Sequence, residues 1–527
     1  MNSKLLFYII TLNLVTISST IFSQTPTGEE LKWSKPIKSA KALRVSADIN
    51  YGMDISGFND DYFVVEAESN KDPNITIMDI TDLSIVKTFE EYRPLYKGKK
   101  YFFKASKVFH DKILIVSATK INPKLAVLDY IIQVCSLPNL NVEETIEVGN
   151  AMDYCNGVPR STYGNVYNYY NEPLFFKNPE PAIEFIESEN GEHLVLIFTN
   201  TPAKGTPIKY LYYTFDKEME FKRIEKSISG VLRKKYQRQN IFFSNDGDLY
   251  MIYLQVVSTK RINRYFYDFS NSQKVLLEGE EYSPITQKIY EHNNKIMITG
   301  NSIVNGGFSL FITEYDAEDI KFLDPLLVPV DVSQTLIYRD KKTIEKFKKK
   351  PKELPFLNFY IDNLKYIDNG DILIYGESYQ HIGSSGNQTT AHQTGEIFVF
   401  RITNEGTLVY FTVIPKDQYF YNVENMNECY GSYISFINDD KLHFIFEDHP
   451  KKYANPTSRS SVTNRSSQTS EYILSIDEGS LEKRIWLDNS KNNIYPSPSL
   501  SVDISNNNYI IGSYLKNNFR FAILNYE

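Results

Sequence analysis

The chain repeats a short polar turn that is followed at once by four or five apolar residues. Eight such turns begin near Asn59, Asp111, Asn190, Asn245, Asn293, Asn369, Asn438 and Asn506. The runs that follow them, such as Leu194–Phe198 and Ile372–Tyr375, are continuous apolar stretches bounded by turn residues. This pattern is typical of strands buried on both faces, as in the stacked blades of a propeller. A repeat along the whole chain also favours one closed array over several domains.

Each repeat predicts a blade of four strands, named A to D here, in which the polar turn joins A to B. We expect blades at 50–90, 101–149, 181–228, 239–279, 283–325, 358–415 and 431–488. An eighth copy starts near Ser497 and contains only A, B and C, while Leu31–Ile37 forms a strand without a blade. Pairing of Leu31–Ile37 with Phe519–Asn525 would close the ring and remove an open sheet edge. The predicted fold class is therefore all-β, an eight-bladed β-propeller, and seven blades are the alternative.

The first 23 residues have the pattern of a signal peptide. Lys4 precedes the apolar stretch Leu5–Ile17, and a small residue, Ser23, stands before the expected cut. A membrane anchor is the alternative, but a stretch of about 13 residues is shorter than the roughly 20 of a spanning helix. We therefore expect residues 24–527 to form a single exported propeller domain in the periplasm, at the cell surface or outside the cell, with no membrane span.

Composition and charge agree with a packed β protein. Tyr (39) and Phe (33) are abundant, and aromatic residues suit pleated, half-buried surfaces. The net charge of −8 is mild and argues against nucleic acid as a partner. One helix is expected, at Ser333–Glu353, with its lysines on a solvated face. We expect a monomer.

Strand alternation divides the connections between two faces. The A–B and C–D turns emerge on one face, called the trimmed face, and the B–C loops and D–A links emerge on the other, called the elaborated face. The long irregular segments of the second kind are 151–180, 201–207, 326–357, 379–396, 416–430, 447–471 and 487–497. Because sites concentrate on loops that a rigid scaffold holds, we expect any ligand on the elaborated face.

Three of these segments contain side chains suited to ligand binding. The candidates are Tyr167, Tyr169 and Tyr170 in the first, Tyr379, His381 and His392 in the second, and Asp448 and His449 in the third. The tyrosines suit stacking on sugar rings or clasping of a peptide, and packing of the loop onto the propeller is the alternative. Glycines near His381 resemble a phosphate cradle, but the P-loop lysine and a following helix are missing, which favours a flexible loop.

The sequence contains no strong catalytic or metal-binding motif. The three histidines named above lack metal-ligand spacing, and no Gly-x-Ser-x-Gly occurs, so we expect no cofactor and no metal. A binding or scaffold module for a protein, peptide or glycan is favoured. The alternative is a carbohydrate-active or other hydrolytic enzyme whose acid and base come from separate blades. Close carboxylates in a pocket at the axial mouth would favour the enzyme, and a broad aromatic surface would favour binding.

The three cysteines, Cys135, Cys155 and Cys429, are expected to stay unpaired. Cys155 follows blade two and Cys429 precedes blade seven, which places them on opposite sides of an eight-bladed ring. Cys135 lies toward the trimmed end of a strand C. A disulfide requires Cα atoms within about 7 Å, so neither pairing with Cys155 fits this arrangement.

Two segments near the C-terminus resemble a known group of proteins. Ile397–Leu408 (IFVFRITNEGTL) and Ser432–Phe444 (SYISFINDDKLHF) are similar to exported, uncharacterised propeller-like proteins of Bacteroidota. The similarity covers roughly the C-terminal third of the chain. It implies a propeller in a bacterial envelope setting, and it implies no assigned activity and no catalytic residues.

Overall fold

A computed structural model provides the structure of the protein. It describes residues 27–28, 30–38, 53–67, 74–122, 127–149, 182–199, 208–228, 236–258, 261–277, 282–305, 307–339, 342, 344–345, 349, 359–383, 390–421, 433–458, 461–463, 466–504, 508–515 and 518–526. The signal-peptide region and the segment 151–180, with Tyr167, Tyr169 and Tyr170, lie outside these residues.

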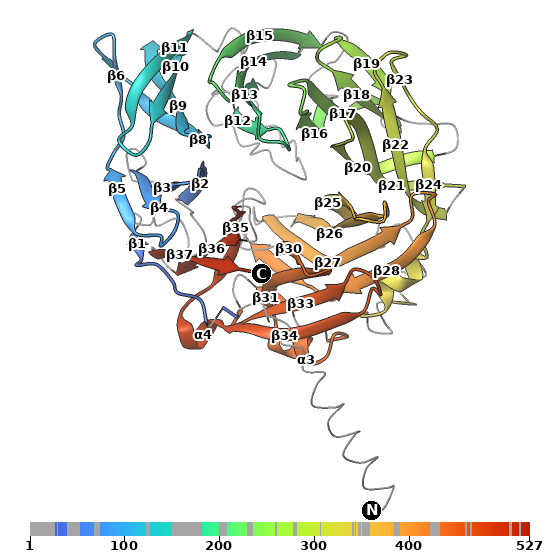
Figure 1. Ribbon diagram of the computed structural model, residues 1–527. Coiled ribbons are helices and arrows are strands. Elements are labelled where there is room, and N and C mark those ends of the chain that lie inside the picture. The colour runs from blue at the N-terminus through green and yellow to red at the C-terminus, as the bar shows by residue number, and fades with distance from the viewer. Residues whose placement is uncertain are drawn as a thin grey trace, which may run out of the picture.

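Eight sheets surround a central axis and form an all-β propeller, as the sequence predicts (Figure 1). Blades 1 to 4 are β2 (Met53–Phe58), β3 (Tyr62–Ala67), β4 (Asn74–Asp79) and β5 (Ile85–Phe89); β8 (Phe102–Phe109), β9 (Lys112–Asn122), β10 (Val127–Ser136) and β11 (Asn141–Gly149); β12 (Ala182–Glu187), β13 (His193–Thr199), β14 (Ile208–Asp216) and β15 (Phe221–Ile228); and β16 (Tyr236–Phe243), β17 (Leu249–Ser258), β18 (Arg261–Asp268) and β19 (Gln273–Leu276). A small hairpin, β6 (Leu95–Tyr96) and β7 (Lys99–Lys100), follows blade 1.

The other four blades have the same order, with additions in blades 5 and 6. They are β20 (Tyr282–His292), β21 (Lys295–Val304), β22 (Gly307–Asp316), β23 (Lys321–Phe322) and β24 (Leu326–Pro329); β25 (Phe359–Tyr366), β26 (Ile372–Gly383), β27 (Thr390–Ile402) and β28 (Leu408–Ile414); β30 (Ile434–Asn438), β31 (Lys441–Asp448), β33 (Gln468–Ser475) and β34 (Leu481–Asp488); and β35 (Pro496–Asp503), β36 (Asn508–Leu515), β37 (Asn518–Asn525) and β1 (Ile37–Lys38). The first strand in each of these sets lies next to the axis (Figure 1). In blade 8 the inner strand is β35, and the N-terminal strand β1 is the outer strand.

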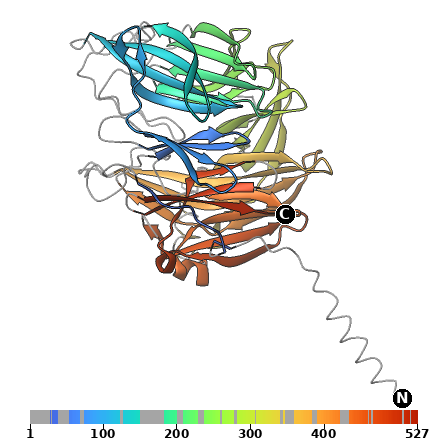
Figure 2. The same ribbon diagram turned by 60° about the vertical axis from the view of Figure 1, so that its left-hand side comes forward.

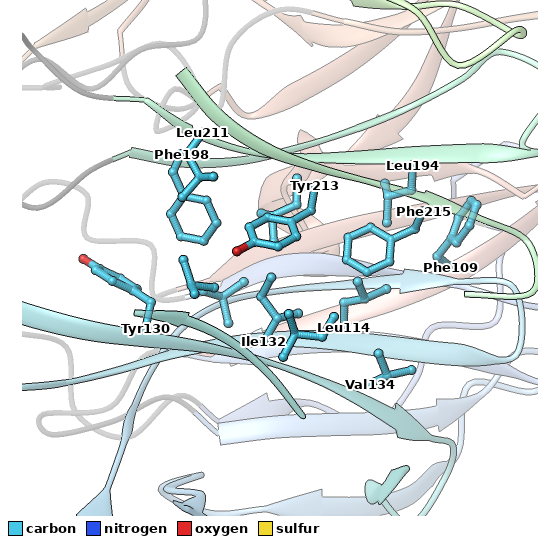
Figure 3. Close-up of a cluster of buried hydrophobic side chains, with 14 of the residues drawn as sticks. Phe109, Leu114, Tyr130, Ile132, Val134, Leu194, Phe198, Leu211, Tyr213 and Phe215 are labelled. Carbon is cyan, nitrogen blue, oxygen red and sulfur yellow. The ribbon is translucent and has the colours of Figure 1, made fainter. Parts of the chain in front are cut away.

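The hydrophobic core is divided among the seams between neighbouring blades. Between blades 2 and 3, Tyr130 of β10 packs against Phe198 of β13 with ring centroids 5.7 Å apart, within a cluster that also contains Leu194 and Tyr213 (Figure 3). All five residues of Leu194–Phe198 are buried, some against blade 2 and the others against blade 4. The interpretation of the apolar runs as strands buried on both faces is therefore confirmed.

The N-terminal segment closes the ring as predicted. Ile37 pairs with Phe519 of β37, and the Ser34 N–H donates to the Phe521 carbonyl at 2.7 Å. Further back, the Gly28 N–H donates to the carbonyl of Trp486 in β34 at 2.9 Å, so the segment also ties the outer strand of blade 7. Figure 2 shows this blue segment lying against the red C-terminal blade. Regular pairing is limited to the two residues of β1, shorter than the expected Leu31–Ile37 strand.

The elaborated face is more ordered than the sequence indicates. The expected loop 379–396 is wrong, because β26 and β27 continue past the blade as a paired hairpin from Tyr379–Thr394 to Gly383–Thr390. β29 (Gln418–Tyr421) pairs with this extension, and β32 (Val462–Thr463) pairs in parallel with β29. The segments beginning at 379 and 447 therefore lie on the same face, as predicted. Every A–B and C–D turn between these strands spans at most five residues, so the opposite face is trimmed.

The helical content is small and partly unexpected. Within the predicted helix 333–353, a 3₁₀ helix spans Val332–Leu336, and positions 342, 344, 345 and 349 are helical. Two short helices were not expected: α3 (Pro450–Ala454), which His449 caps, and α4 (Asn489–Asn492), which Asp488 caps. Among the described residues, no helix has the length and apolar character needed to cross a membrane.

Candidate functional site

Five charged or phenolic side chains converge where the axis opens on the elaborated face. They are Lys288 of β20, Asp362 of β25, Glu377 of β26, Lys416 in the link after β28, and Tyr433 immediately before β30. We call them the axial cluster. β20, β25 and β30 are the inner strands of three consecutive blades, so the fold brings together residues far apart in sequence (Figure 1).

A β-bulge in the inner strand positions Asp362. The pairing of β25 with β26 skips from Ile361 to Asn363, so Asp362 is the extra residue. The same two-against-one irregularity recurs in the inner strands of blades 1, 2, 4 and 5. Bulges bend a strand and re-aim a side chain, and they are frequent beside binding sites. Opposite the bulge, Gly376 leaves room for the backbone, since a Cβ atom there would lie 1.9 Å from the Tyr360 carbonyl oxygen.

Asp362 accepts one hydrogen bond through its carboxylate and another through its backbone carbonyl. The Tyr433 hydroxyl donates to Asp362 Oδ2 at 2.5 Å, and Lys288 Nζ donates to the Asp362 carbonyl oxygen. Asp362 is half-buried, and burial together with the negative charge of Glu377 raises its pKa to about 7. Burial also lowers the pKa of Lys288, although the negative charge of Asp362 opposes this effect. Burial therefore favours the uncharged form of both Asp362 and Lys288.

Beneath Asp362, Lys416 and Glu377 form a buried ion pair. Lys416 Nζ lies 2.5 Å from Glu377 Oε2, and both side chains are fully enclosed. The same ammonium donates to Thr394 Oγ1 at 2.8 Å and lies 6.0 Å from the centroid of the Tyr433 ring. An enclosed pair with further hydrogen bonds fixes geometry more than it adds stability. It holds the link between blades 6 and 7 against the base of the hairpin β26–β27.

A second set of charged and polar side chains connects segments of the elaborated face outside the axial cluster. Arg339 pairs with the buried carboxylate of Glu396, and Gln393 Nε2 donates to Asp417 Oδ1 at 2.8 Å. Burial raises the pKa of Asp417. The next residue, Gln418, donates from Nε2 to the Glu447 carbonyl at 2.7 Å, which connects blade 6 to blade 7. Together with the β26–β27 extension, β29 and β32, these side chains form a connected surface over blades 6 and 7, which we call the platform.

Three of the predicted site residues have structural contacts within the blades and loops. Tyr379 and Asp448 lie within strands and are 3% and 2% exposed. Tyr472 donates to Asp448 Oδ2 at 3.1 Å, and burial raises the pKa of Asp448 to about 6. Half-buried His449 accepts from the Lys451 N–H at 3.1 Å, and burial lowers its pKa. Tyr379, Asp448 and His449 thus hold the platform together.

His381 and His392 are placed by their backbone. They are directly opposite partners in the extension of the β26–β27 hairpin. Among the residues that the structure describes, no three His, Cys, Asp or Glu side chains are grouped so that they could hold a metal ion. The backbone places these two histidines at opposite positions of one hairpin on the elaborated face. Tyr167, Tyr169 and Tyr170 lie outside the described residues.

Sequence reasoning missed the axial cluster. Asp362, Glu377 and Lys416 lie in or beside strands, where the apolar pattern drew attention away from single charges. One signal was present: the run Ile372–Tyr375 is followed by Gly376 and then Glu377. A glycine inside a strand indicates a bulge or a close backbone approach, and a carboxylate after it marks that place.

The opposite face has a groove of its own. A cavity of about 470 Å³ lies between the trimmed ends of blades 8 and 1. Phe58, Ile80, Leu83, Ile504 and Ile523 supply its apolar lining, and Lys32, Asn59, Asp60, Thr81, Asp82, Asn508 and Asn525 supply its polar lining. Asn59 Oδ1 is already occupied by the Tyr62 N–H of its own turn. The groove is separate from the axial cluster and is an alternative place for a ligand.

Comparisons with known proteins find similarity to solved structures alone. No family model and no curated protein matches the chain. Among solved structures, the chain is similar to the Dos1 propeller, with TM-score 0.42 and 10% identity over 96% of this chain and 98% of that one. It is also similar to a prolyl endopeptidase (TM-score 0.35, 10% identity, 92% of this chain and 55% of that one) and to the WD40 domain of SCAP from fission yeast (0.34, 9%, 93% and 98%). At such identities the similarity concerns the fold alone.

Proposed function

We propose that this chain is an exported binding module that holds a protein, peptide or glycan on its elaborated face. A β-propeller suits a binding or scaffold role in general, because its closed ring of sheets holds connecting segments in fixed positions. The observation that carries the proposal is the platform over blades 6 and 7. There the β26–β27 extension, β29 and β32 are joined by backbone pairing instead of forming separate loops.

A rigid platform favours binding because little conformational entropy is lost when a ligand docks. Four of its charged side chains form two ion pairs, Lys416–Glu377 and Arg339–Glu396. Such pairs resist rearrangement, so the surface above them keeps its shape. The polar axial mouth lies beside this platform and gives a ligand hydrogen-bonding groups.

The alternative is a carbohydrate-active or other hydrolytic enzyme. It is supported by the nearness of the Asp362 and Glu377 carboxylates and by the pKa of Asp362, which is raised to about 7. Glycoside hydrolysis requires two carboxyl groups that both reach the scissile bond. Here Lys416 encloses Glu377, which leaves one carboxylate available, so we favour binding.

Export is part of the proposal. It is supported by the pattern of residues 1–23 and by the resemblance of Ile397–Leu408 and Ser432–Phe444 to exported proteins of Bacteroidota. The ligand would then be met in the periplasm, at the cell surface or outside the cell. Mass spectrometry of the chain secreted by a bacterial host should show Gln24 as the first residue, and an uncleaved N-terminus would contradict export.

The binding proposal is tested by capture on immobilised protein from a bacterial envelope extract, together with a glycan array. Hydrogen exchange of the complex should show protection at Gln418–Tyr421 and Pro450–Ala454 on the elaborated face. A matched pair of exposed charges provides the control: Lys451→Glu on α3 should weaken capture, and Glu405→Lys in the C–D turn of blade 6 should leave it unchanged. Protection confined to the short A–B and C–D turns would contradict the proposal.

A further inference from the structure

Asp362 and Lys288 offer a hydrogen-bond acceptor and donors side by side at the axial mouth. Asp362 Oδ2 is taken by Tyr433, whereas none of the described groups donates to Oδ1. Lys288 Nζ donates to the Asp362 carbonyl, and no second acceptor for it occurs among the described residues. An ammonium has three donors, so two of them remain. Both residues are half-buried and not fully enclosed.

The charges of the axial cluster select against a strongly charged ligand. When Asp362 is ionised, the two lysines and two carboxylates balance, with the uncharged phenol of Tyr433 between them. A cation near Asp362 would meet Lys288 and Lys416, and an anion near Lys288 would meet Asp362 and Glu377. Repulsion by the charges of the same sign would cancel much of the attraction that the ion feels toward the charge of opposite sign. A neutral ligand that both donates and accepts is suited to this mixture.

An aromatic ring completes the site. Tyr360 lies directly opposite Glu377 in the β25–β26 register, so both side chains emerge on the same face of the blade. Tyr360 is half-buried, and its ring meets that of Tyr379 edge-on, with centroids 6.0 Å apart. A tyrosine ring supported in this way offers an apolar face beside polar groups. Sugar rings have the matching character, since hydroxyls project around an apolar face.

From these contacts we infer that the axial cluster binds a neutral sugar unit of a glycan. One hydroxyl donates to Asp362 Oδ1, a neighbouring hydroxyl accepts from Lys288 Nζ, and the ring packs on Tyr360. A hydroxyl both donates and accepts, so the same ligand group satisfies either member of the pair. The inference rests on the proposed function and narrows its ligand classes to glycans.

The test is isothermal titration calorimetry with neutral tetrasaccharides of the gluco, manno, xylo and galacto series. At least one series should bind the wild-type chain. Asp362→Ala and Lys288→Gln should each weaken that binding about tenfold or more, because each removes a hydrogen bond that involves a charged group. Asp60→Asn, at the rival groove on the trimmed face, should leave the affinity unchanged. Thermal melting of each variant verifies that it is folded.

Four outcomes would overturn the inference. If no neutral tetrasaccharide binds while protein capture from envelope extract persists, the glycan inference fails and the binding proposal stands. If binding survives Asp362→Ala and is lost in Asp60→Asn, the sugar occupies the groove between blades 8 and 1. If tetragalacturonate binds better than every neutral sugar, the lysines dominate and the charge argument is wrong. Loss of binding in Lys288→Gln alone, with Asp362→Ala unchanged, also contradicts the paired contact.

Discussion

Lys416 and Glu377 form an ion pair 2.5 Å apart in which the two side chains are 0% and 1% exposed. Removing either charge leaves the other buried, which in proteins costs about 3–5 kcal/mol. We expect Lys416→Met to lower the free energy of unfolding by that amount, as measured by thermal or urea unfolding. Replacing both residues, as Lys416→Met with Glu377→Leu, should recover most of the loss because no unpaired charge remains.

The control for this prediction is an exposed pair of similar length. Lys321 Nζ lies 2.6 Å from Asp319 Oδ2, and the two side chains are 55% and 62% exposed. Solvent screens this pair, so Lys321→Met should change the free energy of unfolding by less than about 1 kcal/mol. Equal effects of the two lysine substitutions would show that burial of the Lys416 pair has no energetic consequence.

Ring closure by the N-terminal segment predicts the effect of truncation. Deleting residues 24–38 removes the bonds of Ser34 to Phe521 and of Gly28 to Trp486 and exposes the edge of β37. We expect a lower melting temperature and aggregation, because an open strand edge pairs with other chains. Deleting residues 24–26 alone leaves every described contact of the segment and should preserve both properties. Unchanged melting and solubility of the longer deletion would refute closure.

The raised pKa of Asp362 predicts how stability depends on pH. The pKa is about 7 in the folded chain, against an ordinary value of 3.8, so between these values the folded chain holds a proton that the unfolded chain has lost. Stability therefore falls as pH rises from about 4 to about 7 through this group. The Asp362→Asn variant cannot ionise at this position, so its stability does not fall through this group as pH rises.

The measurement is the difference in melting temperature between Asp362→Asn and wild type. It should increase in favour of the variant as pH rises through this window and then level off above it. Asp448, whose pKa is raised to about 6, contributes in the same direction to both proteins and cancels in the difference. A difference that is constant from acid to neutral pH would mean that Asp362 is ionised throughout.

The local pattern of apolar and polar residues is sufficient to predict the strands of the ring. It is not sufficient to predict the paired strands on the elaborated face. Runs such as Leu194–Phe198 predict strands because every residue in them is buried, some against each neighbouring blade. The hairpin beyond Tyr379 is polar and contains glycines, so its sequence has the composition of a loop. It becomes a strand because Gln418–Tyr421 pairs with it, and that partner lies in another segment of the chain. Pairing of this kind leaves no local signature.

The axial cluster escaped the sequence analysis for a related reason. Whether Asp362 faces the axis depends on a one-residue bulge, and a one-residue change of register reverses the direction of a side chain. Lys416 reaches Glu377 only because the link after β28 folds back over blade 6. These relationships depend on the assembled ring. The expectation that a ligand binds the elaborated face came from strand alternation together with the long connections, and it stays a prediction.

The buried cysteine allows a simple chemical prediction. Cys135 is free and enclosed between blades 1 and 2, and burial raises the pKa of its thiol to about 12. It should not react with a thiol reagent in the native protein, because the thiolate is the reactive form. After denaturation without reduction, all three cysteines should titrate as free thiols, as the blade assignment of Cys155 and Cys429 predicts. A count of one would mean that two cysteines are bridged.

The glycine opposite the bulge connects the fold to the candidate site. A Cβ atom at position 376 would lie 1.9 Å from the Tyr360 carbonyl and 2.8 Å from the Asp362 nitrogen, both backbone atoms that cannot rotate away. Gly376→Ala must therefore displace the bulge that aims Asp362. We expect a loss of about 1–3 kcal/mol in the free energy of unfolding, the usual effect of forcing a methyl group into a packed interior.

The same substitution should also change the site itself. With the bulge displaced, the pH-dependent stability assigned to Asp362 should diminish, because that carboxylate moves away from the Tyr433 hydroxyl and becomes more exposed. Gly307→Ala is the matched control, since a Cβ atom there meets nothing closer than the Val304 carbonyl at 3.5 Å. It should preserve both stability and its pH dependence. If Gly376→Ala behaves like Gly307→Ala in both measurements, the bulge is not what holds Asp362 at the axial mouth.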